Sequence, residues 1–252
     1  MIISSHRLIR ILFLLILSSS AYAQSFITTW KTDNPGSSSA TQITIPTTGG
    51  GYNYDIIWTE VGNPTNTGTL SNVLGNVTID FPSTGTYRVE ISGQFPRIYF
   101  NAASFRPDGD SRKILTVEQW GNISWTSMAA AFSGCVNLRV NAIDAPDLSG
   151  VTSLSQMFYE STAFNDNINH WDVSTITDLA GTFREASSFN QPLTLWNVGN
   201  VGDMTELFFL ATAFNQNIGS WNVSNVTSMS LMFAGAMAFN QDISSWVVSN
   251  VT

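Results

Sequence analysis

A block of 25 residues recurs four times between residues 151 and 252, and this period constrains the fold more than any other feature. The aromatic positions recur without a slip, at Trp171, Trp196, Trp221 and Trp246 and at Phe164, Phe189, Phe214 and Phe239. Such a period is typical of a repeat protein, in which one unit cannot bury its apolar side chains alone and stacks on its neighbours. We therefore expect the two aromatic columns to form a buried structural spine.

The apolar spacing changes halfway through each block. Val226, Met229, Phe233 and Ala236 recur at helical spacing, which predicts a short helix. The second half, residues 239–248, is too irregular for a helix and carries β-favouring residues, which favours a short strand and a turn. The repeats therefore predict an α/β solenoid with one short strand and one short helix per repeat.

The region before the repeats has a different pattern. Short apolar alternations lie at residues 42–45, 54–58, 77–81, 87–91 and 97–100, with Gly- and Pro-rich turns between them. Strands at this spacing predict an all-β sandwich. Residues 106–110 form a polar joint, so we expect a sandwich over 24–108 and a solenoid over 109–252. Within the solenoid, residues 112–150 read as a degenerate cap and residues 151–252 as regular repeats, the last one truncated.

The first 23 residues have the pattern of a signal peptide. Arg7 and Arg10 precede the apolar run 11–17, and residues 21–23 (Ala-Tyr-Ala) match a signal-peptidase site. The apolar run is far shorter than the roughly 20 residues needed to cross a bilayer. We therefore expect an exported protein, extracellular or on the outer cell surface, with no membrane-spanning segment in the mature chain.

Charge and cysteine content exclude several classes of partner. The formal net charge is −8, which disfavours nucleic acid and anionic membranes because both require basic side chains. The single cysteine, Cys135, rules out an internal disulfide.

Catalytic and metal sites have little support in the sequence. An enzyme needs a constellation of unlike residues, whereas this chain repeats the same ones. Cys135 and His170 could serve as a nucleophile and base, but they lie on different repeats and the sequence suggests no third residue to orient them. The carboxylates Asp166, Asp172, Asp178 and Asp203 do not recur in every copy and form no calcium loop. We predict no catalytic residue, no cofactor and no metal.

Two repeated columns allow either a structural or a binding role. The tryptophans could form an exposed strip for glycans, but residues in phase with every other apolar column are usually core. The asparagines Asn165, Asn190, Asn215 and Asn240 could bind a ligand. We favour a ladder in which each amide satisfies backbone groups of the next repeat.

One column differs in every copy inside this invariant frame, and it consists of Tyr159, Arg184, Phe209 and Ala234. Variation at such a column can set specificity without harming the core. We predict that these residues contact a partner.

The repeat resembles a known family. The phrase F-N-Q-x-I-x-x-W-x-V-S-x-V-T-x-M, at residues 214–229, resembles the repeat of BspA-like leucine-rich-repeat surface proteins of bacteria, and A-F-x-x-C-x-x-L at residues 131–138 is similar to another of their phrases. The resemblance implies a leucine-rich-repeat-type solenoid, an extracellular location and adhesion to host proteins or other cells. Residues 85–93 resemble a PKD-like sandwich.

These observations predict a secreted or cell-surface, non-enzymatic binding protein that adheres to a protein or glycan on a host or neighbouring cell. An alternative is the non-catalytic, glycan-binding portion of a larger exported hydrolase. A purely structural spacer is a third class. Because residues 249–252 stop where another helical half should start, we also expect the chain to be a fragment of a longer array.

Overall fold

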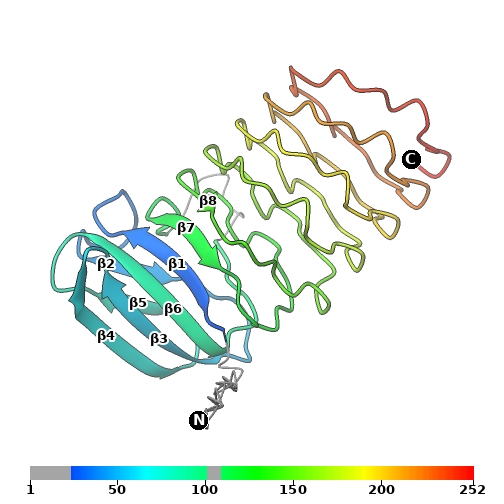
Figure 1. Cartoon of the computed structure of the whole chain (residues 1–252). Coiled ribbons are helices and arrows are strands. Elements are labelled where there is room, and N and C mark those ends of the chain that lie inside the picture. The colour runs from blue at the N-terminus through cyan, green and yellow to red at the C-terminus, as the bar shows by residue number, and fades with distance from the viewer. Residues whose placement is uncertain (1–23, 101–108) are drawn as a thin grey trace, which may run out of the picture.

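The computed structural model describes residues 24–100 and 109–252. The predicted signal peptide lies outside the described residues, as does most of the joint expected at 106–110. A layered β region forms the N-terminal part (Figure 1). The repeats form a stack that extends away from it towards the C-terminus, and we call each 25-residue repeat of this stack a coil.

The β region contains one large and one small sheet. The large sheet has the order β4 (Asn63–Val73), β3 (Asn53–Glu60), β6 (Thr86–Gln94), β1 (Phe26–Lys31), β7 (Ile114–Gln119) and β8 (Arg139–Val140). All neighbours are antiparallel except β7 and β8, which pair in parallel. The small antiparallel sheet consists of β2 (Gln42–Ile45) and β5 (Val77–Asp80). The large sheet thus continues past residue 108 into the region assigned to the repeats.

Four of the five strands expected from the sequence are confirmed, those at 42–45, 54–58, 77–81 and 87–91. The strand expected at 97–100 is wrong, because this segment has no ladder partner. The sequence also missed β4, whose residues are all exposed or half-buried, so that no apolar alternation marks it.

The core of the β region lies between the two sheets. Alternate residues of β6, namely Tyr87, Val89 and Ile91, are buried, and Ile43 and Ile79 of the small sheet are buried with them. A glycine serves this packing on β4: a Cβ at Gly68 would lie 2.4 Å from Cζ2 of Trp58, its partner on β3. The glycine therefore makes room for the indole.

A buried ion pair lies in the segment just before β7, and its two residues hydrogen-bond the loop before β2 and the start of β2. The Lys113 ammonium lies 3.8 Å from the Asp110 carboxylate, and both side chains are fully buried. Lys113 Nζ also donates to the carbonyl oxygens of Ser38, Ser39 and Gln42 at 3.1, 2.8 and 2.8 Å. Burial lowers the pKa of Lys113, while the nearby Asp110 opposes that shift. The surrounding acceptors are what allow this charge to be buried.

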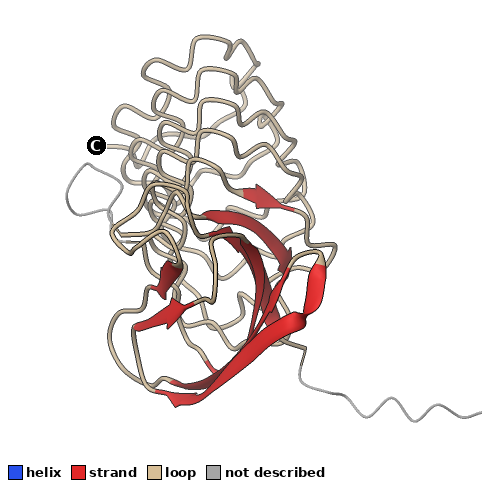
Figure 2. Ribbon diagram, turned by 90° about the vertical axis from the view of Figure 1, so that its left-hand side faces the viewer, coloured by secondary structure: helices blue, strands red, loops and turns tan. Residues whose placement is uncertain are grey.

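The described residues contain no helix, so the predicted α/β solenoid of strand-plus-helix repeats is wrong (Figure 2). The reason is the destination of the backbone N–H groups. In an α-helix each would bond a carbonyl four residues earlier. Here the N–H groups of Leu154, Gln156, Phe158 and Glu160 bond carbonyls of the following coil at 2.8–3.0 Å. The same four-bond ladder recurs between the next two pairs of coils.

The segment expected to be helical is instead a series of β-turns. In the first regular coil, Met157 N bonds Leu154 O at 2.9 Å and Ser161 N bonds Phe158 O at 3.1 Å. The third residues of these turns, Gln156 and Glu160, have φ of 55° and 58°. A positive φ at that position with a normal φ before it defines a type II turn. Apolar side chains three or four residues apart therefore share a face without any helix.

The second half of each repeat was predicted to be a strand and is not. Between the regular coils, β-type pairing is limited to isolated parallel β-bridges, which join Ser153, Asp178, Asp203 and Ser228 in succession. The leucine-rich-repeat interpretation is wrong for the same reason, since neither its helix nor its strand is present. The described part of the chain is all-β, with strands β1 to β8 between residues 26 and 140.

Stacked phenylalanines fill the interior of the coils. One column joins Phe132, Phe158, Phe183, Phe208 and Phe233 at centroid distances of 5.6–6.1 Å. The predicted column from Phe164 to Phe239 runs beside it, and its own consecutive rings are 5.3–6.0 Å apart. Within each coil the ring of one column lies 3.8–4.2 Å from the ring of the other. Trp120 continues this core into the sheets, with its ring 5.2 Å from Trp171 and 5.7 Å from Phe26.

Over residues 24–100 and 109–252, no helix is long and apolar enough to span a membrane.

Candidate partner-binding face

The tryptophan column lies inside the stack. Trp171, Trp196 and Trp221 are buried, and Trp246 in the final coil is partly buried. Indole Nε1 of Trp196 donates to Ile168 O at 3.1 Å, and Trp221 and Trp246 repeat this bond to Leu193 and Ile218. Rings in this position hold consecutive coils together, and the three buried ones offer no exposed surface for a glycan to stack on.

The asparagine column forms a chain of side-chain-to-backbone bonds. Oδ1 of Asn165 accepts the backbone N–H of Asn190 at 2.8 Å, and the Asn190–Asn215 and Asn215–Asn240 steps repeat it at 2.9 Å. The following glutamine adds a bond to the same oxygen, for example Gln216 Nε2 to Asn190 Oδ1 at 2.8 Å. The Oδ1 atoms of Asn165, Asn190 and Asn215 are thereby engaged within the fold.

The structure does not bring Cys135 and His170 together. Cys135 is fully buried, and this burial raises the pKa of its thiol, which disfavours the reactive thiolate. His170 is exposed, and its Nε2 lies 3.3 Å from the carbonyl oxygen of Asp144.

The candidate calcium carboxylates serve in turns and pairs. Asp166 binds Arg139 in a bidentate pair at 2.7–3.1 Å. Asp172, Asp178 and Asp203 each accept the N–H two residues later at 2.8–3.0 Å. Within the described residues, no group of three or more His, Cys, Asp or Glu side chains could hold a metal ion.

The column of Tyr159, Arg184, Phe209 and Ala234 lies on the side of the stack that the type II turns form. Its first three members contact one another. The Arg184 guanidinium lies 5.3 Å from the ring of Tyr159 and 4.9 Å from the ring of Phe209. It also pairs with Glu206, and its Nε is 3.3 Å from Glu185 Oε1. A ring, a cation and a second ring are thus stacked across three consecutive coils.

Two flanking columns vary in the same way and belong to the same face. One contains Gln156, Gly181, Glu206 and Leu231, and the other contains Glu160, Glu185, Leu210 and Gly235. We call these eight residues, together with Tyr159, Arg184, Phe209 and Ala234, the variable face. Sequence reasoning named only the central column, although the aligned repeats already differ at the flanking ones.

All eight flanking residues have a left-handed backbone, with φ between 54° and 74°. Glycine is the residue that tolerates this conformation without cost, yet only two of the eight are glycines. Each of the other side chains costs on the order of 1 kcal/mol in backbone strain. The coil does not need these six side chains to turn, since glycine occupies the same columns at Gly181 and Gly235.

The charged half of the face surrounds Tyr159 and Glu160. Burial raises the pKa of Glu160, and the neighbouring Glu185 raises it further, while Arg112 and Arg184 oppose the shift. Burial and the same carboxylates also raise the pKa of Tyr159. Glu160 Oε2 is enclosed and has no hydrogen-bond partner among the described residues.

The other half of the face is apolar. Leu210 is 37% exposed and Leu231 is 55% exposed. The Leu210 side chain packs over Gly235 of the fourth coil, where a Cβ would lie 2.4 Å from Leu210 Cδ2. The variable face therefore changes from acidic and aromatic near the sheets to aliphatic in the later coils.

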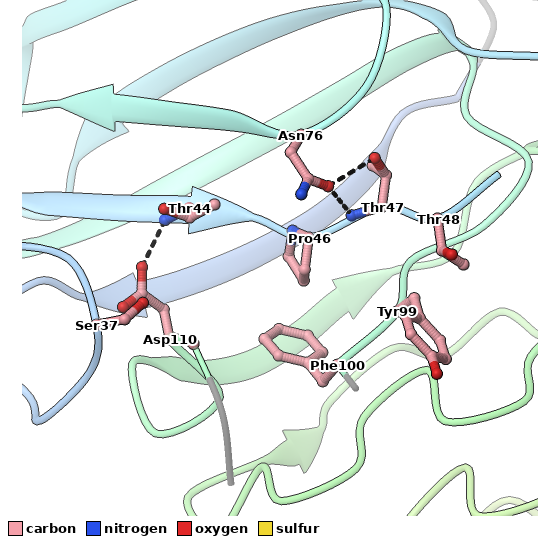
Figure 3. A pocket seen from close by; sticks show the side chains of 10 residues that line it. Ser37, Thr44, Pro46, Thr47, Thr48, Asn76, Tyr99, Phe100 and Asp110 are labelled. Carbon is pink, nitrogen blue, oxygen red and sulfur yellow. Dashed lines mark hydrogen bonds between the residues drawn. The ribbon is translucent and has the colours of Figure 1, made fainter. Parts of the chain in front are cut away.

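The β region holds a separate pocket of about 310 Å³. Pro46 and Phe100 face each other across it, with Tyr99 at one end and Asp110 at the other (Figure 3). Asn76 Oδ1 on the rim accepts the N–H and hydroxyl of Thr47 at 2.5 and 2.8 Å. The Asp110 carboxylate is already bonded to Ser38 and Thr44. Phe100 and Gly109, the described residues on either side of 101–108, both line the pocket.

Comparison with known proteins places the repeats in relation to one family. A family model described as "Mycoplasma protein of unknown function, DUF285" matches residues 126–246, just under half of the chain. The repeat region is thus similar to that family, and the interpretation as a BspA-like protein with a PKD-like sandwich was wrong. No curated protein and no solved structure matches the chain.

Proposed function

We propose that this chain is an exported, non-enzymatic binding protein that adheres to a protein or glycan on a host or neighbouring cell surface. The variable face is the surface that makes the contact. The observation that supports it is the set of six non-glycine side chains held at left-handed positions. Strain of this kind persists where a side chain has a use that outweighs its cost.

Export is part of this proposal. It rests on the n-region, apolar run and cleavage pattern of residues 1–23. The proposed extracellular surface location follows from that segment.

Glycine substitutions test the role of the face without damaging the coil. Gly181 and Gly235 already occupy the two flanking columns, so Glu206→Gly and Leu210→Gly should fold. Each relieves left-handed strain, offset by about 0.5–1 kcal/mol of glycine entropy, and Glu206→Gly also loses the ion pair with Arg184, so the double variant should fold and melt at or slightly below the temperature of the parent. Saturable binding of the full chain would be measured on a panel of glycans and immobilised extracellular matrix proteins.

A variant at another corner of the same coils is the matched control. Leu195 is 70% exposed, and serine stands at the same column as Ser220 and Ser245, so Leu195→Ser should fold. We expect binding to be lost in the glycine double variant and kept in the control. Full binding by a folded double variant would exclude the variable face.

The pocket of the β region favours a second candidate, the glycan-binding portion of a larger exported hydrolase. Its lining combines an aromatic ring at Tyr99 with hydroxyl and amide groups at Thr47, Thr48 and Asn76, a mixture suited to a sugar. On this alternative, Tyr99→Ala abolishes glycan binding, and the glycine double variant leaves it unchanged.

A further inference from the structure

The variable face carries more negative than positive charge. Of its twelve residues, Glu160, Glu185 and Glu206 are carboxylates and Arg184 is the one cation. Arg112 lies close enough to act on Glu160, so three carboxylates stand against two cations and the balance remains negative. A cation brought to this surface would therefore be attracted to it.

The face already shows how it holds a cation. The Arg184 guanidinium lies between the rings of Tyr159 and Phe209, at 5.3 and 4.9 Å, and pairs with two carboxylates. This combination of ring faces and carboxylates is the environment in which proteins recognise guanidinium groups. In the next coil Ala234 follows Phe209 in the column, so there the chain supplies only a methyl group.

The aliphatic half of the variable face, Leu210 and Leu231, indicates that the partner also carries an apolar group. Leu210 and Leu231 are exposed beside Phe209, on a face that no other part of the described chain covers. Exposed leucines next to carboxylates complement a segment that carries both an apolar and a basic side chain.

We infer that the partner is a protein whose docking segment presents an arginine or lysine beside an apolar residue. The basic group faces the carboxylates of Glu160 and Glu185, and the apolar side chain packs on Leu210 and Leu231. This inference rests on the proposed function and specifies the chemistry of the partner.

Two synthetic peptides serve as probes for the full chain. One is a dodecamer of alternating arginine and leucine, and its twin carries citrulline, which has the same shape without the charge, at every arginine. The arginine peptide should bind several-fold more tightly than the citrulline peptide, and its affinity should fall as salt is added.

Point variants locate the binding on the face. Glu160→Gln removes one charge, and its Oε2 makes no hydrogen bond with the described residues, so the variant should weaken binding of the arginine peptide about two- to fivefold. Asp172→Asn is the matched control, because Asn197 and Asn222 occupy its column in later coils. Equal binding of both peptides would overturn the inference, as would equal weakening by both variants.

The same variants separate this inference from the proposed function. Suppose that the glycine double variant loses binding to a panel partner, while binding of that partner by the parent chain changes neither with salt nor on Glu160→Gln. The variable face then binds a partner, but the inference of a basic docking segment is wrong. If the double variant keeps its panel partner, the proposed function itself is wrong.

Discussion

At the scale of single residues, the most informative group is the Glu160 carboxyl. Its pKa is raised, first by burial and then by Glu185, with Arg112 and Arg184 opposing. The folded state therefore binds its proton more tightly than the unfolded state does. Between the usual carboxyl range and the raised folded pKa, stability falls as pH rises, and above that window the penalty is complete.

The variant Glu160→Gln should remove this penalty. At neutral pH we expect it to melt at a higher temperature than the parent, and the difference should vanish below about pH 4, where the carboxyl is protonated in both states. Thermal melts across this pH range would measure it. Asp172→Asn should show no such gain, because hydrogen bonds from Ser174 lower the pKa of Asp172 and its stabilisation is lost at acid pH. A pH-independent gain in Glu160→Gln would contradict the assignment.

At the scale of the element, the repeating unit is a pair of type II turns whose N–H groups bond the next coil. The left-handed position in each turn determines which substitutions a coil accepts. Gly181 has a φ of 62°, whereas Gly202, in the same stack, does not have a positive φ. The two glycines therefore differ in backbone conformation while sharing the same chemistry.

Alanine substitution should separate these two glycines. Gly181→Ala should cost roughly 1 kcal/mol because its backbone is left-handed. Gly202→Ala should be neutral or slightly stabilising, since its added Cβ meets nothing closer than Thr177 O at 3.8 Å. Chemical denaturation of both variants would measure the difference. The Cβ at Gly181 would lie 3.3 Å from Gln156 Cγ, so a double variant with Gln156→Ala removes that contact. Recovery of stability in the double variant would show that crowding, rather than φ, was responsible.

The same element explains which parts of the fold the sequence could predict. The period of 25 and the alternation of strands such as β6 are direct consequences of side-chain burial, so they are visible in the residue pattern. The helix prediction was wrong because Val226, Met229 and Phe233 report only which side chains point inward. That spacing is shared by a helix and by successive turns, and the destination of the N–H groups distinguishes them.

The candidate face was only partly visible for a related reason. The column of Tyr159, Arg184, Phe209 and Ala234 stands out by its variation alone. That Arg184 lies between two rings depends on the distance between coils, which no single repeat encodes. The significance of Glu206 and Leu210 depends on their φ values, 55° and 54°, which the sequence does not reveal where glycine is absent.

At the scale of the whole molecule, the sheets and the coils share one core. Trp120 is fully buried and contacts Phe26 of β1, Phe132 of the first coil and Trp171 of the next repeat, at 5.7, 6.0 and 5.2 Å. β7 also pairs with β1 on one side and with β8 on the other. The two regions should therefore unfold together.

The variant Trp120→Ala tests this coupling. Loss of the ring should cost about 3–5 kcal/mol, and amides of both β6 and the coil at 176–200 should lose protection from hydrogen exchange. Trp246→Ala is the comparison, because Trp246 is partly buried in the last coil and should affect only its neighbours. Loss of protection confined to one region in Trp120→Ala would show that the sheets and the coils are independent units.

The direction of the hydrogen bonds between coils has an electrostatic consequence. On the variable face the earlier coil donates its N–H groups to the later one, as Phe158 does to Thr182, whereas on the threonine side Thr177 donates back to Thr152. In a helix all peptide dipoles point the same way and sum to a macrodipole. Here the two sides of the stack oppose one another, so their dipoles partly cancel. Each added coil therefore contributes a smaller net dipole along the axis than the same number of peptide groups would contribute in a helix.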